Sequence, residues 1–145
     1  MFVGTFTPRL DDKGRLILPA KFRDALAGGV TVVKGQEHCL ALWPKAKFDE
    51  IANEIHGPET NVEMRRYRRL LMSGADDQRP DRQGRITVHP ALRAYAGLDR
   101  DCTLIGVGPH LELWDSAAWQ RYLETEEPAF AAFSSAPGGS PMSTG

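Results

Sequence analysis

The sequence predicts an α+β fold with a mainly β core, built from two copies of one small unit. Three observations predict it: a motif that recurs at an offset of 70 residues, apolar runs of strand length bounded by turn residues, and 41% hydrophobic residues in a chain of 145. A unit of roughly forty residues is smaller than most chains that fold alone. We therefore expect the two copies to share one core.

The internal repeat organises the whole chain. Residues 11–16, DDKGRL, recur as residues 81–86, DRQGRI. Further features follow both motifs in the same order, the later ones after a one-residue slip: Phe22-Arg23 with Leu92-Arg93, Gly35 with Gly106, and Leu42-Trp43-Pro44 with Leu113-Trp114-Asp115. Several features in one shared order indicate duplication of a unit.

Each copy reads as a strand, a glycine turn, a strand, a short helix, two further strands and a longer helix. The strands expected after the turns are residues 16–18, 30–35, 39–43, 86–88, 102–107 and 111–114. The short helices should begin near Pro19 and Pro90, because proline at the first helical position loses no hydrogen bond. The longer helices should begin at Pro44 and at Asp115, which can act as an N-cap.

The remaining segments set the expected domain boundaries. We assign residues 1–57 to the first unit, 58–75 to a connecting segment, 76–125 to the second unit and 126–145 to a disordered tail, whose last stretch, SSAPGGSPMSTG, consists of residues that cannot bury apolar surface. The connecting segment should be helical over 59–73. Its inward face is expected to carry Met64, Tyr67, Leu70 and Leu71, and its outward face Arg65, Arg66, Arg68 and Arg69.

Charge and cysteine content limit the class of protein. The net charge of −1 argues against a protein that coats nucleic acid indiscriminately, yet residues 1–48 hold eight Lys/Arg and four acids, a local balance of +4. No leader-like segment or long apolar run is evident, so we expect a cytoplasmic protein without membrane contact. Cys39 and Cys102 lie in apolar runs typical of buried, reduced thiols.

The two glycine turns carry the candidate function. In the first, Asp11 can open a type I turn and Gly14 can close it with positive φ; Asp81 and Gly84 can do the same in the second. Such turns would hold the neighbouring side chains on rigid hairpins. The candidate DNA-binding residues are Arg9, Lys13, Arg15, Arg82, Gln83 and Arg85.

Residues 1–23, 81–98 and 111–122 resemble the MraZ family of transcriptional regulators, and the resemblance covers about residues 1–125. It implies a tandem AbrB-like swapped-hairpin β-barrel with flanking helices, in which Asp11/Arg15 and Asp81/Arg85 are the residues to carry over. It also implies a homo-oligomeric ring, an octamer or dodecamer, associated with the nucleoid. Its partner would be double-stranded DNA at the promoter of the division and cell-wall gene cluster.

The two motifs differ in ways that predict unequal contributions of the two hairpins to DNA binding. The first offers Lys13 where the second offers Gln83, and in the second copy the proline comes one residue later, after His89. Head-to-tail assembly into a ring would present all hairpins with the same sense. The operator upstream of the protein's own operon should therefore be a run of direct repeats about 10 bp apart.

Other interpretations of the same residues remain open. Arg15 and Arg85 can each bond their own aspartate and only stabilise the turn, although one guanidinium edge would then still be free for DNA. Arg9, Arg79 and Arg82 suit a solvated surface equally well, and the four-arginine face suits a solvated or subunit-pairing surface. As whole-protein alternatives we keep an antitoxin-like module with a protein partner, and a structural ring scaffold without a nucleic-acid role.

Enzyme chemistry has little support in the sequence. Asp76, Asp77 and Asp81 could hold Mg²⁺, but no phosphate-cradling glycine loop accompanies them. The histidines lack the paired spacing of a zinc site, and no nucleophile elbow surrounds a serine. We therefore expect no catalytic residue, no metal, no cofactor and no small-molecule substrate.

Overall fold

We describe the protein from a computed structural model, which describes residues 1–55 and 61–134. The strands of the larger sheet are β1 (Thr5–Phe6), β3 (Val30–Lys34), β4 (Leu40–Pro44), β5 (Asp76–Gln78), β7 (Cys102–Gly106) and β8 (Leu111–Asp115). Their order is β1-β7-β8-β4-β3-β5, and every neighbouring pair is antiparallel. A second, two-stranded sheet pairs β2 (Arg15–Ile17) with β6 (Arg85–Thr87).

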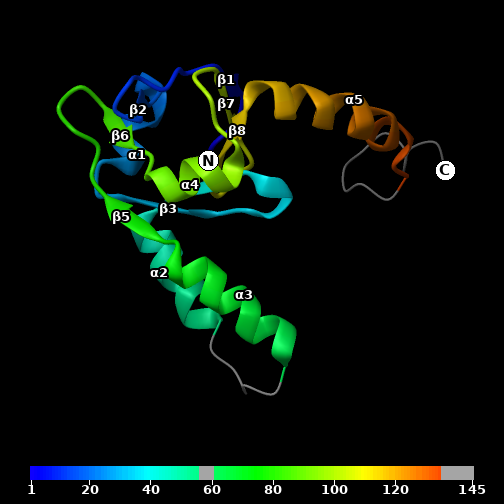
Figure 1. Cartoon of the computed structure of the whole chain (residues 1–145), viewed down its shortest axis with the longest axis horizontal. Coiled ribbons are helices and arrows are strands. Elements are labelled where there is room, and N and C mark those ends of the chain that lie inside the picture. The colour runs from blue at the N-terminus through cyan, green and yellow to red at the C-terminus, as the bar shows by residue number, and fades with distance from the viewer. Residues whose placement is uncertain (56–60, 135–145) are drawn as a thin grey trace.

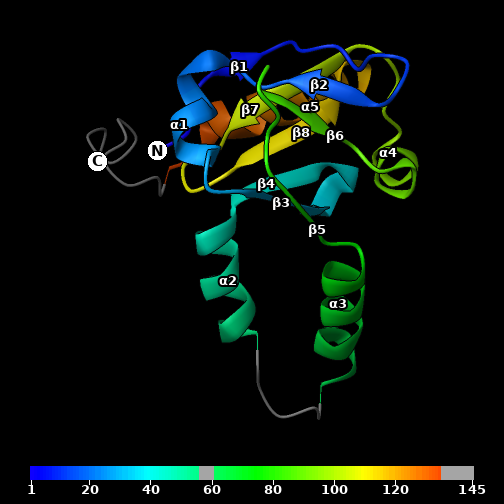
Figure 2. The ribbon, with the colours of Figure 1, turned by 90° about the vertical axis from the view of Figure 1, so that its left-hand side faces the viewer.

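Helices surround this β structure on several sides (Figures 1 and 2). They are η1 (Ala20–Phe22), α1 (Arg23–Leu26), η2 (Gln36–His38), α2 (Lys45–Glu54), α3 (Val62–Ser73), α4 (Pro90–Ala96) and α5 (Ser116–Ala132). Helices α2 and α3 form a two-helix arm that stands off the β core, and α5 leads away in another direction. None of the helices in the described residues combines the length and apolar character that a membrane crossing requires.

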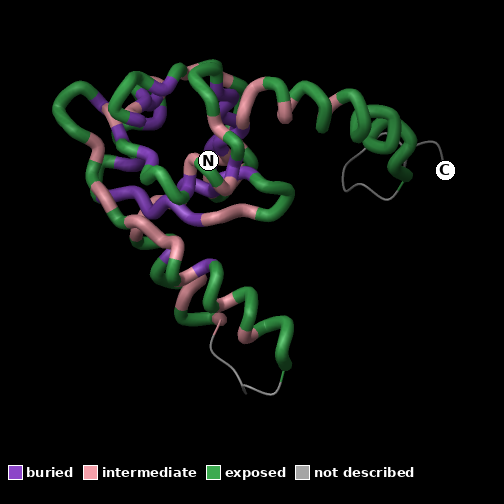
Figure 3. Tube along the Cα trace, viewed as in Figure 1, coloured by how far each residue is buried: buried purple, intermediate pink, exposed green. Residues whose placement is uncertain are grey.

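The two copies share one hydrophobic core. Leu16 and Leu18 of the first copy pack with Ile86 and Val88 of the second, and all four side chains are at most 1% exposed. Figure 3 shows the buried residues concentrated in the β core, whereas the arm and α5 are largely exposed. The predicted α+β class with a mainly β core is confirmed.

Strands from the two copies interleave. In the larger sheet, β1 of the first copy pairs with β7 of the second, with Thr5 opposite Ile105. The centre of the sheet joins β4 to β8, with Leu40 opposite Leu113. Because neighbouring strands come from both copies, neither copy completes its backbone hydrogen bonding alone.

The predicted inward face of the connecting helix is wrong at three of its four positions. Leu71 is buried, but Met64, Tyr67 and Leu70 are 43%, 42% and 51% exposed. Helix α3 turns a different face towards α2: Leu71 and Met72 pack with Phe48 and Ala52 of α2. On the same side, Arg68 Nε donates to the carbonyl oxygen of Ile55, the C-cap residue of α2. A cation there is favoured by the negative end of the helix dipole.

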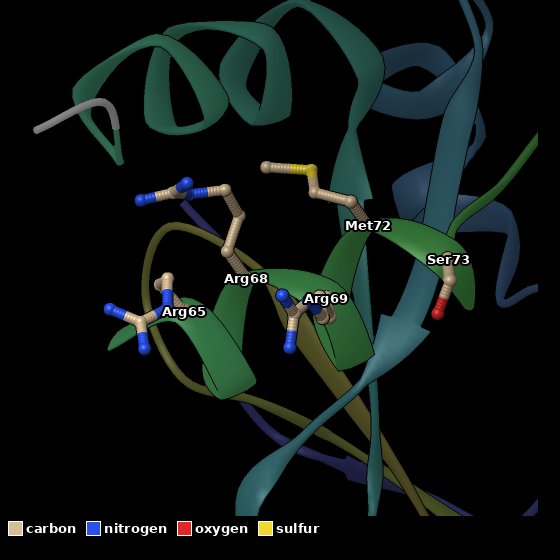
Figure 4. A pocket seen from close by; sticks show the side chains of 5 residues that line it. All are labelled: Arg65, Arg68, Arg69, Met72 and Ser73. Atoms are coloured by element: carbon tan, nitrogen blue, oxygen red, sulfur yellow. The ribbon is translucent and has the colours of Figure 1, made fainter. Parts of the chain in front are cut away.

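The arginines that flank this contact also depart from prediction. Arg65 and Arg68 are partly buried and, with Met72, line the space between α3 and α2 (Figure 4). Of the four arginines, Arg66 and Arg69 are exposed. The predicted start of the helix at residue 59 lies outside the described residues, and Asn61 caps α3 by accepting from Met64 N at 3.1 Å.

The structure also corrects the expected start of the C-terminal tail. Helix α5 begins as predicted, with Asp115 Oδ2 accepting from Ala118 N at 3.1 Å. It then continues through Pro128 to Ala132, so the first residues of the expected tail, from 126, are helical. The first residues of the expected tail include the good helix formers Glu and Ala, a signal that the assignment from the Gly/Pro/Ser-rich end of the tail overlooked. Residues 135–145 of the expected tail lie outside the described residues.

Candidate nucleic-acid interface

A single aspartate closes each of the two turns. Asp11 Oδ1 accepts the backbone N–H of Lys13 and of Arg15, both at 2.9 Å, and the N–H of Gly14 donates to the Asp11 carbonyl at 3.0 Å. Gly14 has φ +76°, a left-handed conformation that a residue with a Cβ rarely adopts. The side chain of Asp11 and the backbone freedom of Gly14 thus fix the first turn, as the sequence predicts.

The second turn repeats this geometry closely. Asp81 Oδ1 accepts the N–H of Gln83 and of Arg85, both at 2.9 Å, and Gly84 also has φ +76°. Donation by the N–H of Arg85, followed by its guanidinium, lowers the pKa of Asp81. The two turns are therefore structurally equivalent despite their different tip residues.

Each arginine forms an ion pair with the aspartate of its own turn. Arg15 Nε lies 2.8 Å from Asp11 Oδ2, and Arg85 Nε lies 2.7 Å from Asp81 Oδ2. Backbone donation by Arg15 comes first among the causes that lower the pKa of Asp11 to about 2. Within the described residues, the terminal guanidinium nitrogens of both arginines donate to no protein group. The ion pair with the turn aspartate thus leaves the outer edge of each guanidinium, with its terminal nitrogens, available to bind another molecule.

Strands β2 and β6 form an antiparallel ribbon that brings the two arginines onto one face. Arg15 lies opposite Thr87, and Arg85 lies opposite Ile17. Diagonal neighbours in such a pair are about 7–8 Å apart. The buried side chains of Leu16 and Ile86 alternate with these residues and face the core. The outer face of the ribbon carries Arg15, Ile17, Arg85 and Thr87, of which Ile17 is 55% exposed.

The turn of each copy is hydrogen-bonded to a strand of the other copy. The backbone N–H of Leu18 donates to the Gly84 carbonyl at 2.9 Å, and that of Val88 donates to the Gly14 carbonyl at 2.7 Å. Each turn thus rests on the strand that follows the other turn. This crossed hydrogen bonding makes the ribbon one rigid unit.

Two arginines that were not among the predicted site residues pack against the turns. A Cβ added at Gly14 would lie 2.9 Å from Arg93 Cζ, and a Cβ at Gly84 would overlap the guanidinium of Arg23. Each arginine belongs to the copy opposite the turn that it contacts. The repeat pairs Arg23 with Arg93 at the offset of 70, which is the one signal that pointed to them.

The other predicted residues lie at or near the turn tips. Lys13, Arg82 and Gln83 are exposed at the tips. Arg9 forms an exposed ion pair with Asp101, with 2.9 Å between Arg9 Nε and Asp101 Oδ1. The charge of Arg9 is therefore partly neutralised by an acid of the second copy.

The acidic residues near the second turn do not form a common site. Asp77 accepts from the Thr31 hydroxyl at 2.5 Å and from Lys45 Nζ at 3.2 Å, and these donors lower its pKa in that order. Asp76 accepts from Gln78, and Asp81 is held within its own turn. In the part of the chain that the structure describes, no three His, Cys, Asp or Glu side chains gather as metal ligands would.

Comparison with known proteins supplies the last observation. A family model described as "MraZ protein, putative antitoxin-like" matches residues 1–70 and again residues 71–137. A protein of Kineococcus radiotolerans is 54% identical over 132 residues, which cover 90% of this chain and 92% of that protein. A protein of Mycobacterium tuberculosis is 53% identical over 135 residues, covering 92% and 94%. Both are named transcriptional regulator MraZ.

Proposed function

This chain belongs to the MraZ family, and from that membership we propose that it is a transcriptional regulator that binds double-stranded DNA through the β2–β6 ribbon. One observation carries the proposal: the outer edges of Arg15 and Arg85 share the exposed face of a rigid two-stranded ribbon. The major groove of B-DNA admits such a ribbon, and an arginine edge can bond guanine O6 and N7 together.

The remaining residues of the interface have different tasks. Lys13 and Arg82 at the tips suit phosphate contact, which positions the protein without reading sequence. Gln83 is uncharged, so the second hairpin should contribute less than the first. On the same face, exposed Ile17, opposite Arg85, offers an apolar surface for a thymine methyl group.

Assembly extends this interface to a longer operator. We infer that subunits form a ring, because one chain of net charge −1 can reach only a few phosphates. Hairpins arranged head to tail would read direct repeats about one helical turn, ~10 bp, apart. The site of action is then the nucleoid in the cytoplasm, upstream of the protein's own operon in the division and cell-wall gene cluster.

The exposed apolar end of α5 favours a second candidate, an antitoxin-like function through a protein partner. Phe130 is 80% exposed there. A protein with this function would bind its partner through α5 and bind DNA weakly or not at all.

Arginine substitutions test the proposed function directly. Arg15→Ala should weaken binding of an operator duplex by roughly 5- to 150-fold per engaged subunit, the equivalent of one lost bidentate contact of ~1–3 kcal/mol. Arg85→Ala should weaken it less. Fluorescence anisotropy measures the affinity, and circular dichroism checks that the fold survives.

Two matched variants make the outcome specific. Arg121→Ala removes an exposed arginine of α5 and should leave the affinity unchanged. Arg15→Lys keeps the charge but loses the bidentate geometry, so it should bind nearly as weakly as Arg15→Ala if a base edge is contacted. An Arg15→Ala protein that melts, yet whose folded fraction binds DNA normally, would show that the arginine only stabilises its turn.

The arrangement of the operator is tested separately by footprinting. Inverting one repeat, or shifting it by half a helical turn, should weaken binding, because the hairpins of neighbouring subunits face the duplex with one sense. Undiminished affinity for the inverted or shifted site would show that assembly does not dictate the operator.

A further inference from the structure

Each of the two turns carries an arginine of the opposite copy on its glycine. Arg93, in α4 of the second copy, lies against Gly14 of the first turn, and Arg23, in α1 of the first copy, lies against Gly84 of the second. The place that a Cβ would take at Gly14 is within 3.2 Å of the Cζ, Nε and Nη1 atoms of Arg93. The guanidinium therefore covers the side of the turn that the missing side chain leaves open.

The Arg93 side chain forms no hydrogen bond or ion pair with any residue that the structure describes. Its Nε is buried without an acceptor, an unfavourable arrangement that native proteins rarely keep. Of the acids that line the same pocket, Asp11 is held within its own turn and Asp99 lies beyond ion-pair distance. Asp12 pairs instead with Arg100, at 2.7 Å. Contact with the first turn is therefore the interaction that the Arg93 guanidinium makes.

Gly14 is the point at which the first turn can most easily change its shape, because glycine adopts many backbone conformations. Its N–H donates to the Asp11 carbonyl at 3.0 Å, and its own carbonyl accepts the N–H of Val88 at 2.7 Å. These two bonds hold its ends, and the Arg93 guanidinium covers its Cα. Together the three contacts keep the peptide group that joins Gly14 to Arg15 in one orientation.

The orientation of that peptide group decides where the Arg15 guanidinium points. The N–H of Arg15 donates to Asp11 Oδ1 at 2.9 Å, and its Nε donates to Asp11 Oδ2 at 2.8 Å. Rotation of the peptide group would break the first bond and displace the second, and the outer edge of the guanidinium would move with them. The equivalent contacts link Arg23 through Gly84 to Arg85.

We propose that Arg93 is a positioning residue for base contact by Arg15, and that Arg23 is a positioning residue for base contact by Arg85. Each acts through the glycine of the opposite copy's turn and not through a phosphate contact of its own. The inference rests on the proposed function and names the residues that aim its two reading arginines. Each copy thus sets the aim of the arginine that belongs to the other copy.

The variant Arg93→Met tests the first of these links. Methionine is of similar length and suits a helix, but it has no planar cation to lie on Gly14. Replacing single operator guanines with 7-deazaguanine finds the base that Arg15 contacts: the replacement should weaken the wild type by roughly 3- to 10-fold and leave Arg15→Ala unaffected. For Arg93→Met the modified and unmodified duplexes should differ by less than about twofold, because a displaced Arg15 no longer bonds N7.

Two matched variants separate packing from charge. Arg100→Met removes another second-copy cation from the same turn, where it forms an exposed ion pair with Asp12, but leaves Arg93 on Gly14, so the 7-deazaguanine penalty should persist. Arg93→Lys keeps the charge without the plane and should behave like Arg93→Met. If instead Arg93→Met keeps the full penalty and its salt slope falls by about 0.9 per engaged subunit, Arg93 contacts a phosphate and the proposal is wrong.

Pairs of variants test the crossed arrangement. Arg93→Met and Arg15→Ala act on one DNA contact, so the double variant should lose little more affinity than Arg15→Ala alone. Arg93→Met and Arg85→Ala act on different contacts, and their fold-losses should multiply. The pattern should reverse for Arg23→Met. Equal coupling of Arg93 with both arginines would show a general loosening of the ribbon and would overturn the proposed pairing.

Amide hydrogen exchange in the free protein separates this inference from the proposed function. Arg93→Met should raise the exchange rate of the Arg15 N–H on the order of tenfold and leave that of the Arg85 N–H unchanged, because only the first turn loosens. If Arg93→Met does not fold, Arg23→Met at an exposed position gives the mirror-image test on Arg85.

The two readouts fail independently. This exchange pattern in a protein for which no guanine replacement matters would sink base reading by Arg15 and leave the positioning contact intact. Unchanged exchange together with an unchanged 7-deazaguanine penalty in Arg93→Met would overturn the positioning role and leave the DNA proposal standing.

Discussion

Replacing Gly14 with alanine should weaken DNA binding while costing the fold little. The left-handed backbone at φ +76° disfavours a Cβ by roughly 1–2 kcal/mol, and the reduced freedom of the unfolded chain restores about 0.4–1 kcal/mol. The new Cβ would also lie 2.9 Å from Arg93 Cζ. That guanidinium is the end of a flexible side chain and can shift, so the net loss should stay near ~1 kcal/mol.

Gly97→Ala is the matched control. Gly97 has φ +60°, and a Cβ there meets nothing within 4 Å. Both variants should therefore lose about the same stability, a fall in Tm of roughly 3–6 °C at one fixed protein concentration. Only Gly14→Ala should lose DNA affinity, on the order of tenfold, because only its turn holds Arg15 on the ribbon.

Calorimetry and anisotropy with one operator duplex decide the matter. Equal loss of affinity in the two variants would show that the turn is not part of the interface. A loss of several kcal/mol of folding stability in Gly14→Ala alone would show that Arg93 cannot move. Either result would refute the reasoning from the turn geometry.

Three further predictions concern pH, salt and thiol reactivity. The N–H of Arg15 holds the pKa of Asp11 near 2, and the pKa of Asp81 is also lowered, so the stability that these carboxylates contribute is present above pH ~4 and is lost as the pH falls towards 2. The double variant Asp11→Asn/Asp81→Asn should therefore show a flatter dependence of stability on pH in acid denaturation. An equally steep dependence would contradict this prediction. The logarithm of DNA affinity should fall with the logarithm of salt by about 0.9 per neutralised phosphate, and a slope near zero would exclude phosphate contact. Burial raises the pKa of Cys39 to about 12 and of Cys102 to about 11, so a thiol reagent at pH 8 should modify them only after unfolding in urea, and rapid native labelling would count against their burial.

The sequence by itself determined the duplication, the fold class and the chemistry of the two turns. These features depend on groups that are close along the chain. Asp11 accepts N–H groups two and four residues away, and Gly14 supplies its φ without help from other segments. Local geometry of this kind follows from residue type and spacing. The candidate arginines Arg15 and Arg85 were found for the same reason.

Only the tertiary structure decided how the copies cross and which helix faces are covered. The packing of Arg93 against Gly14 joins residues far apart in the chain, which no local pattern specifies. Helix α3 shows the same limit: its periodicity indicated an apolar face, yet Tyr67 and Leu70 are exposed, and the side of the helix that packs against α2 is the one that carries Leu71 and Met72. Periodicity tells which side chains share a face, but the cover of that face depends on where distant segments pack.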